Sequence, residues 1–143
     1  MHSYTDTSRL RGRAVLYRLI YAAETVGSTG ASTLSLAQIL GAATVNNRRD
    51  NITSAVMFHD GWCLQGIEGS RQDVDRLMRR IRDDRRLNNI RIVSDKPVAE
   101  RRFPEPMGLC DDPCAMMKAI GLTNMAQITA YHADRIVELK QAA

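Results

Sequence analysis

The chain has 143 residues, of which 44% are hydrophobic and 25% charged, a balance that excludes a disordered or fibrous protein and indicates one globular domain. Its apolar runs are much shorter than the ~20 residues of a membrane span, and the N-terminal stretch lacks the apolar centre of a signal peptide, so a cytoplasmic protein is expected. The formal net charge is +4, from 20 basic and 16 acidic residues, which allows only weak attraction to phosphates.

The first half of the chain alternates between strand and helix patterns. Residues 1–13 are expected to form a flexible arm. The stretch AVLYRLIY, residues 14–21, is apolar on both alternating faces and predicts a buried strand. Apolar residues at helical spacing predict a helix over residues 33–44, and ITSAVMF, residues 52–58, resumes strand character. The turn residues 59–61 follow, so WCLQGIEG is predicted to form a hairpin with the preceding strand.

The second half of the chain begins with the clearest helix. Its apolar residues are spaced i, i+3, i+4 and i+7 and form one stripe: Val74, Leu77, Met78 and Ile81. Arginines and aspartates alternate on the opposite face, which is typical of a solvated surface rather than a nucleic-acid site. A fourth strand is predicted at 89–94, a turn at 95–97 and a fifth strand at 98–103, at a sheet edge. This β-α-β-β-α-β-β order predicts an α+β, ferredoxin-like fold with both helices on one sheet face.

The last 35 residues are predicted to form a helical cap. Asp112 can cap a helix that has Pro113 at its first position, Gly121 can end it, and Asn124 can start a second amphipathic helix. We expect these two helices to cover the open sheet face or to form a dimer surface there, so a homo-oligomer is expected. The predicted division is an arm at 1–13, a sheet domain at 14–108 and a cap at 109–143.

The sequence offers little support for an enzyme. Its histidines, His2, His59 and His132, are scattered, and no neighbouring Ser, Cys or Asp repeats a catalytic-triad spacing. Cys110 and Cys114 lack the further Cys or His ligands of a metal site, and three cysteines without paired spacing indicate reduced thiols. Neither a GxGxxG motif nor a P-loop is present. We therefore expect no catalytic activity and no metal.

Four polar residues stand where a packed α/β core favours apolar ones. Tyr21 ends the first predicted strand, Asn46 and Asn47 follow the first helix, and Gln65 lies in the middle of the third strand. Tyr21 and Asn47 each have a structural explanation, as a backbone-bonded phenol and a helix cap. An unpaired buried amide costs ~1–3 kcal/mol, so Gln65 requires a partner. Amides can donate and accept at once, which suits the edge of a planar heterocycle.

Five stretches in order resemble the successive motifs of BLUF domains, blue-light sensors that use FAD, over about residues 14–108: LYRLIYAA, NNRRDNIT, FHDGWCLQGIEG, RRIRDDRR and VAERRFPEPMG. The resemblance implies the fold derived above, with the flavin ring between the two helices on the sheet. It implies that short single-domain members carry two C-terminal helices. It also implies that output passes to a downstream protein through the edge strand and these helices, with no chemistry on a substrate.

The resemblance assigns roles to individual residues. Tyr21 matches the family's photoactive tyrosine, and Gln65 matches the glutamine whose hydrogen bonds change in light. Asn46 and Asn47 match the asparagines that bind the ring's carbonyl and imide edge. The remaining residues expected to contact FAD are Ile39, on the first helix, with Arg48, Asp84, Arg86 and Met107.

Three positions depart from the family pattern. Pro106 stands where the family often has tryptophan, in a strand one residue shorter, and proline removes a donor from strand pairing. Leu87 stands in place of a histidine, and Ser54 in place of a glycine. The alternative is therefore a BLUF-like interaction module without flavin.

Two other classes are disfavoured by the third strand. LQGIEG loosely resembles a strand of acylphosphatases, but the aromatic-arginine sequel that holds phosphate is missing. An RNA-binding sheet stacks bases on several aromatic side chains, and this strand has only Trp62. Neither a phosphatase nor a nucleic-acid partner is expected.

Overall fold

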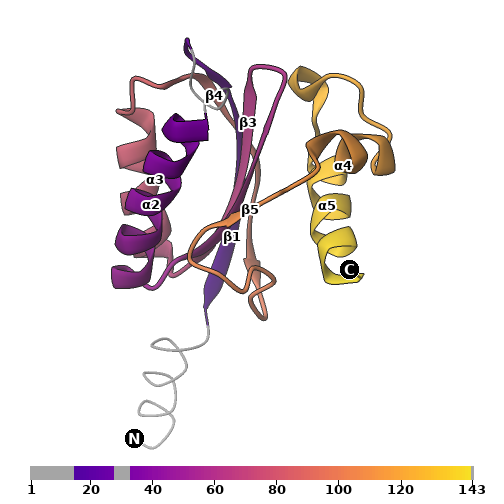
Figure 1. Ribbon diagram of the computed structural model, residues 1–143. Helices are drawn as coiled ribbons and strands as arrows, with labels where there is room; N and C mark the ends of the chain where they lie inside the picture. The colour runs from indigo at the N-terminus through magenta and orange to yellow at the C-terminus, as the bar shows by residue number, and fades with distance from the viewer. Residues whose placement is uncertain (1–14, 28–32, 143) are drawn as a thin grey trace, which may run out of the picture.

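The computed structural model describes residues 15–27 and 33–142, and side chains within 15–27 and 40–139 (Figure 1). The expected arm at 1–13 lies outside these residues. The elements are β1 (Leu16–Thr25), α2 (Thr33–Arg49), β2 (Thr53–His59), β3 (Trp62–Gly69), α3 (Arg71–Arg82), β4 (Leu87–Val98), β5 (Gly108–Leu109), α4 (Pro113–Ala119), the 3-10 turn η1 (Met125–Gln127) and α5 (Ala130–Ala142). The two predicted hairpin strands and the helix at α3 are confirmed.

The strands form one sheet in the order β4-β1-β3-β2-β5, which is the predicted ferredoxin-like arrangement with an additional edge strand. The pairings β1·β4, β1·β3 and β2·β3 are antiparallel, and β2·β5 is parallel. β1 is longer than the predicted strand. The small residues Ala22 and Ala23 continue its pairing with β3, so Tyr21 lies in the middle of the strand rather than at its end.

The predictions for residues 95–103 were wrong. Asp95, Lys96 and Pro97 form no turn, because β4 continues through them in register with β1. β4 is an edge strand, where the missing N–H of Pro97 interrupts no central ladder. The expected fifth strand at 98–103 is absent from its predicted place, and the fifth strand is instead β5, Gly108–Leu109, at the other edge of the sheet.

Helices cover both faces of the sheet (Figure 1). α2 and α3 lie on one face, where Val74, Met78 and Ile81 of α3 pack with Leu19 and other residues of the sheet. α4, η1 and α5 lie on the opposite face, as expected for the cap. The predicted second cap helix is split, because Asn124 caps η1 and α5 begins only at Ala130.

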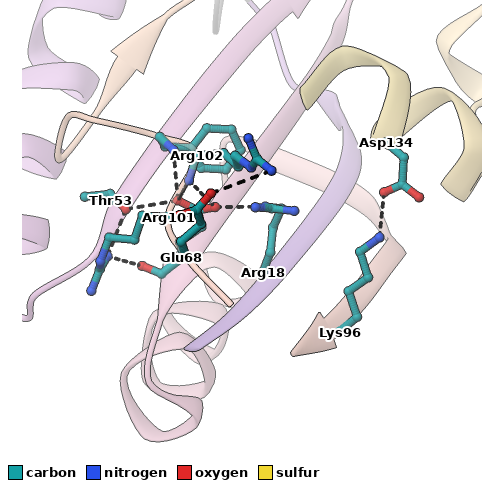
Figure 2. A network of polar contacts seen from close by, with 9 residues as sticks. Arg18, Thr53, Glu68, Lys96, Arg101, Arg102 and Asp134 are labelled. Carbon is teal, nitrogen blue, oxygen red and sulfur yellow. Dashed lines mark hydrogen bonds and ion pairs between the residues drawn. The ribbon is translucent and has the colours of Figure 1, made fainter. Parts of the chain in front are cut away.

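A buried carboxylate holds the chain segment that follows β4 (Figure 2). Glu68 of β3 has no exposed surface, and its Oε2 accepts from the Arg18 guanidinium at 2.8 Å. The same carboxylate accepts from the backbone amides of Arg102 and Phe103 at 2.9 Å, and from Thr53 Oγ1 at 3.3 Å. These amides therefore bond a side chain instead of a neighbouring strand, which explains why residues 101–103 form no strand.

Phe103 shows how closely this segment lies on the sheet. A Cβ atom added to Gly66 of β3 would lie 2.6 Å from the Phe103 ring, so only glycine leaves room for the ring on that face. Phe103 is 4% exposed and packs in the cluster beneath the cap, with Ile20, Leu64 and Met117. The segment is thus part of the cap-side core.

Candidate functional site

A cavity of about 200 Å³ lies between the sheet and the helices α2 and α3. Its floor is formed by side chains of the three central strands, which alternate along each strand and therefore point to the same face. Its walls come from the C-terminal half of α2, from α3 and from the start of β4. The lining residues are Tyr21, Ala42, Ala43, Asn46, Asn47, Val56, Phe58, Cys63, Gln65, Leu77, Arg80, Ile81, Asp84, Arg86, Leu87 and Met107.

Tyr21 and Gln65 form the centre of the floor. They are directly paired across β1 and β3, and the Tyr21 hydroxyl donates to Gln65 Oε1 at 2.5 Å. The β1·β4 register shifts between Ile20 and Tyr21, a bulge of the kind that re-aims side chains beside functional sites. Tyr21 is 1% exposed. Burial raises the pKa of its phenol well above 10.0, and the adjacent Cys63 acts in the same direction, so the phenol keeps its proton at neutral pH.

Gln65 connects the tyrosine to the edge of the sheet. Its Nε2 donates to the Sδ atom of Met107 at 3.9 Å, while its Oε1 accepts from Tyr21. The Gln65 amide therefore accepts one hydrogen bond, from Tyr21, and donates another, to Met107. Sulfur is a weak acceptor, so a stronger acceptor near Nε2 can compete with this contact.

A second polar cluster lies beside Met107, where β2 meets the segment before β5. Asn47 Nδ2 donates to the Pro106 carbonyl at 2.8 Å and to Ser54 Oγ at 3.3 Å. Ser54 Oγ donates to the same carbonyl at 2.7 Å and lies 3.4 Å from Met107 Sδ. Asn47 and Ser54 are each 1% exposed. With both Nδ2 hydrogens engaged, Asn47 keeps its carbonyl oxygen as the acceptor for a ligand.

The mouth of the cavity is charged. Arg86 binds Asp84 through two nitrogens, at 2.9 and 2.6 Å, and this arginine lowers the pKa of Asp84. Arg80 of α3 donates to Asp50 at 2.9 Å, which links the two helices at this end. The Arg80 and Arg86 side chains are partly exposed and can also meet an anionic group outside.

Seven of the nine residues predicted from the sequence line this cavity: Tyr21, Asn46, Asn47, Gln65, Asp84, Arg86 and Met107. Arg48 is exposed and is not among the lining residues, so its contact with FAD stays a prediction. The side chain of Ile39 lies outside the described residues.

Sequence reasoning missed Cys63, Arg80 and the bridging role of Ser54. Cys63 alternates with Gln65 along β3, and that spacing places both on one face. Arg80 follows Leu77 by three residues, so helical spacing brings the two to one side of α3. The contact of Ser54 with residues 106 and 107 carries no sequence signal, because it joins segments more than 50 positions apart.

The part of the chain that the structure describes shows no sign of a membrane span or a metal centre. No helix there has the length and apolar character to span a membrane. No group of three or more His, Cys, Asp or Glu residues is placed there to hold a metal ion.

The fold and the cavity define a ferredoxin-like α+β protein with a pocket between the sheet and its paired helices. The sequence model of the BLUF family, described as sensors of blue light using FAD, matches residues 16–108. The chain belongs to this family.

Two curated relatives come from Euglena gracilis. They are the photoactivated adenylate cyclase subunits beta, 34% identical over 73 residues and 51% of this chain, and alpha, 32% identical over 78 residues and 54% of this chain. Each match spans 8% of the relative's length.

Solved structures show the same fold. The photo-activated state of BlsA superposes with a TM-score of 0.78 at 21% identity, covering 90% of this chain and 96% of that one. The dark-state structure of BlrB, a BLUF protein, gives 0.69 at 24% identity, over 87% and 98% of the two chains. A bacterial light-regulated adenylyl cyclase gives 0.62 at 26% identity, over 89% of this chain and 33% of that one.

Proposed function

We propose that this protein is a blue-light photoreceptor that binds FAD non-covalently in the cavity between the sheet and α2 and α3. The observation that carries the proposal is the row Tyr21–Gln65–Met107 on the cavity floor, with its two hydrogen bonds of 2.5 and 3.9 Å. In this row the buried phenol of Tyr21 is the proton donor and the Gln65 amide is the relay. The Met107 thioether connects the amide to the edge of the sheet.

The residues present fit a flavin. Val56, Leu77 and Ile81 give apolar contact for the faces of a planar ring, and Asn46, Asn47 and Gln65 offer amide groups for its polar edge. The Asn47 carbonyl oxygen suits an imide N–H donor, and the Gln65 amide suits a ring acceptor. Arg80 and Arg86 at the mouth suit the phosphates of FAD.

FAD, when bound, supplies the absorption of blue light and an excited ring that accepts an electron. Tyr21 supplies that electron. Its proton leaves along the hydrogen bond to Gln65 Oε1, where the separation of 2.5 Å allows transfer without movement of heavy atoms. Because burial disfavours the phenolate, electron and proton leave Tyr21 together rather than the proton alone.

Gln65 would retain the change after both the electron and the proton have returned to Tyr21. Its amide would have rotated or tautomerised, which would alter the hydrogen bonds that Gln65 makes with Tyr21 and Met107 and the group that it presents to a bound flavin. A new hydrogen bond from Gln65 to a carbonyl of bound flavin would shift the absorption of the flavin to longer wavelength. The change at Gln65 is local, because it involves one side-chain amide on the cavity floor.

The signal leaves the pocket through Met107 and β5. β5 pairs with Ala55 and Val56 of β2, and the Cys110 amide donates to the Val56 carbonyl at 3.0 Å immediately before α4. A shift of Met107 would therefore move β5 and the residues that lead into α4, where the cap begins. A downstream protein that contacts the cap reads this shift, and the packing of the cap is the element that changes between two states.

The test is the absorbance of the purified 143-residue chain before and after blue light. The proposal expects yellow protein that carries FAD and shows a reversible shift to longer wavelength. Colourless protein that takes up no FAD on incubation would overturn it and favour the flavin-less interaction module. FAD-loaded protein with no light-induced shift would contradict the photoreceptor function alone.

A further inference from the structure

The segment that brings Met107 to the pocket has little backbone pairing of its own. We name residues 104–109 the edge strap. Its strand portion, β5, has two residues, and Pro104 and Pro106 have no N–H to donate. The Ser54 amide donates to the Glu105 carbonyl at 3.0 Å. Among the described residues, the other hydrogen bonds to the middle of the strap, residues 105–107, are made by side chains.

Ser54 is the side chain at the centre of those contacts. Its hydroxyl donates to the Pro106 carbonyl at 2.7 Å, accepts from Asn47 Nδ2 at 3.3 Å and lies 3.4 Å from Met107 Sδ. Asn47 donates to the same carbonyl at 2.8 Å, so the three groups close a ring of hydrogen bonds. Ser54 is 1% exposed, so its hydroxyl is shielded from bulk water and depends on these partners for hydrogen bonds.

The Ser54 hydroxyl also contacts the Met107 sulfur, at 3.4 Å. Gln65 Nε2 approaches the same sulfur at 3.9 Å, so Sδ is contacted both by an amide from β3 and by a hydroxyl from β2. The contact with Gln65 is too weak to fix the methionine, since sulfur accepts hydrogen bonds poorly. Fixing the sulfur requires that the backbone on its N-terminal side, at Pro106, be held.

We propose, on the basis of the function proposed above, that Ser54 is a positioning residue: its hydroxyl pins the edge strap at Pro106 and so holds the Met107 sulfur beside Gln65. Ser54 itself contacts neither Tyr21 nor Gln65 through any hydrogen bond of the described residues. Its influence on the photoreaction passes through Met107.

The first test uses hydrogen exchange of the full chain in the dark. Ser54→Ala and Ser54→Gly both remove the hydroxyl, and we expect backbone amides between Glu105 and Cys110 to exchange at least about five-fold faster, as for one lost net hydrogen bond. The amides of α3 should be unchanged. The control is Ser94→Ala, at a half-buried serine of β4 that does not line the cavity. It should change the exchange rates neither of the amides between Glu105 and Cys110 nor of those in α3. Unchanged exchange in both Ser54 variants would overturn the proposal.

The second test measures the rate at which the light-induced shift decays in darkness. Met107→Leu keeps the volume and removes the sulfur acceptor. We expect Ser54→Ala and Met107→Leu each to change the decay rate by at least about three-fold, and the double variant to match Met107→Leu alone. If the two changes multiply instead, Ser54 does not act through Met107. Protein without flavin would defeat the proposed function, while the exchange experiment would still decide whether Ser54 holds the strap.

Discussion

At the scale of single residues, the site depends on one phenol and one amide in contact. Tyr21→Phe removes the proton donor and keeps the ring, and Gln65→Leu removes the amide at similar volume. Both should abolish the light-induced shift and leave FAD bound, because the cavity walls are unchanged. The light-minus-dark difference spectrum measures this. Tyr131→Phe, at an exposed tyrosine of α5, is the matched control and should give a normal shift. A normal shift in either site variant would contradict the assigned roles.

The thiol beside Tyr21 makes a prediction for pH. Burial raises the pKa of Cys63 from 9.0 to about 12. The folded state therefore holds this proton more tightly than the unfolded state, so the contribution is complete below pH 9.0 and is lost as pH rises toward 12. Between pH 8 and 10 the free energy of unfolding should fall by about 1.4 kcal/mol from this group. Urea unfolding of Cys63→Ala should lack this part of the fall, and an equal fall in both proteins would refute the assignment.

At the scale of elements, the contacts of Glu68 explain why the strand predicted at 98–103 does not form. Sequence periodicity identified β2, β3 and α3, because each buries one regular face. It could not show that residues 101–103 lie under a buried carboxylate, since that contact joins positions about 34 apart. For the same reason Ser54 was noted only as a substituted glycine. The sequence predicted the pocket residues that belong to a family motif. It missed Cys63 and Arg80 although regular spacing places them beside other pocket residues, and it missed the role of Ser54 because long-range contacts define it.

Glu68→Gln tests the holding of the segment after β4. The change leaves the Arg18 guanidinium buried without its ion pair, and removing one partner of such a pair costs about 3–5 kcal/mol. The control is Asp134→Asn, which breaks the exposed pair with Lys96 in the same view (Figure 2) and should cost at most about 1 kcal/mol. Denaturant unfolding of both variants gives the comparison. Equal losses would show that Glu68 contributes no more than a surface charge.

At the scale of the whole molecule, one sheet separates two cores with different tasks. The face toward α2 and α3 carries the polar pocket, and the face toward the cap carries a continuous apolar cluster. The edge strap and the segment before it connect the faces, since Phe103 belongs to the cap core and Met107 to the pocket side. A change at the pocket can therefore reach the cap around the edge of the sheet without passing through it.

This division predicts that stability and flavin binding separate by face. Ile128 is 1% exposed in the cap core, and Ile128→Ala should cost about 2–5 kcal/mol of unfolding free energy while the dark absorption of bound FAD stays the same. Leu77 lines the pocket and is half-buried, so Leu77→Ala should cost less stability and weaken FAD retention. Denaturant unfolding and the FAD-to-protein ratio after dialysis measure the two effects. Loss of FAD from folded Ile128→Ala would show that the cap also shapes the pocket, and the two faces would then not be separable.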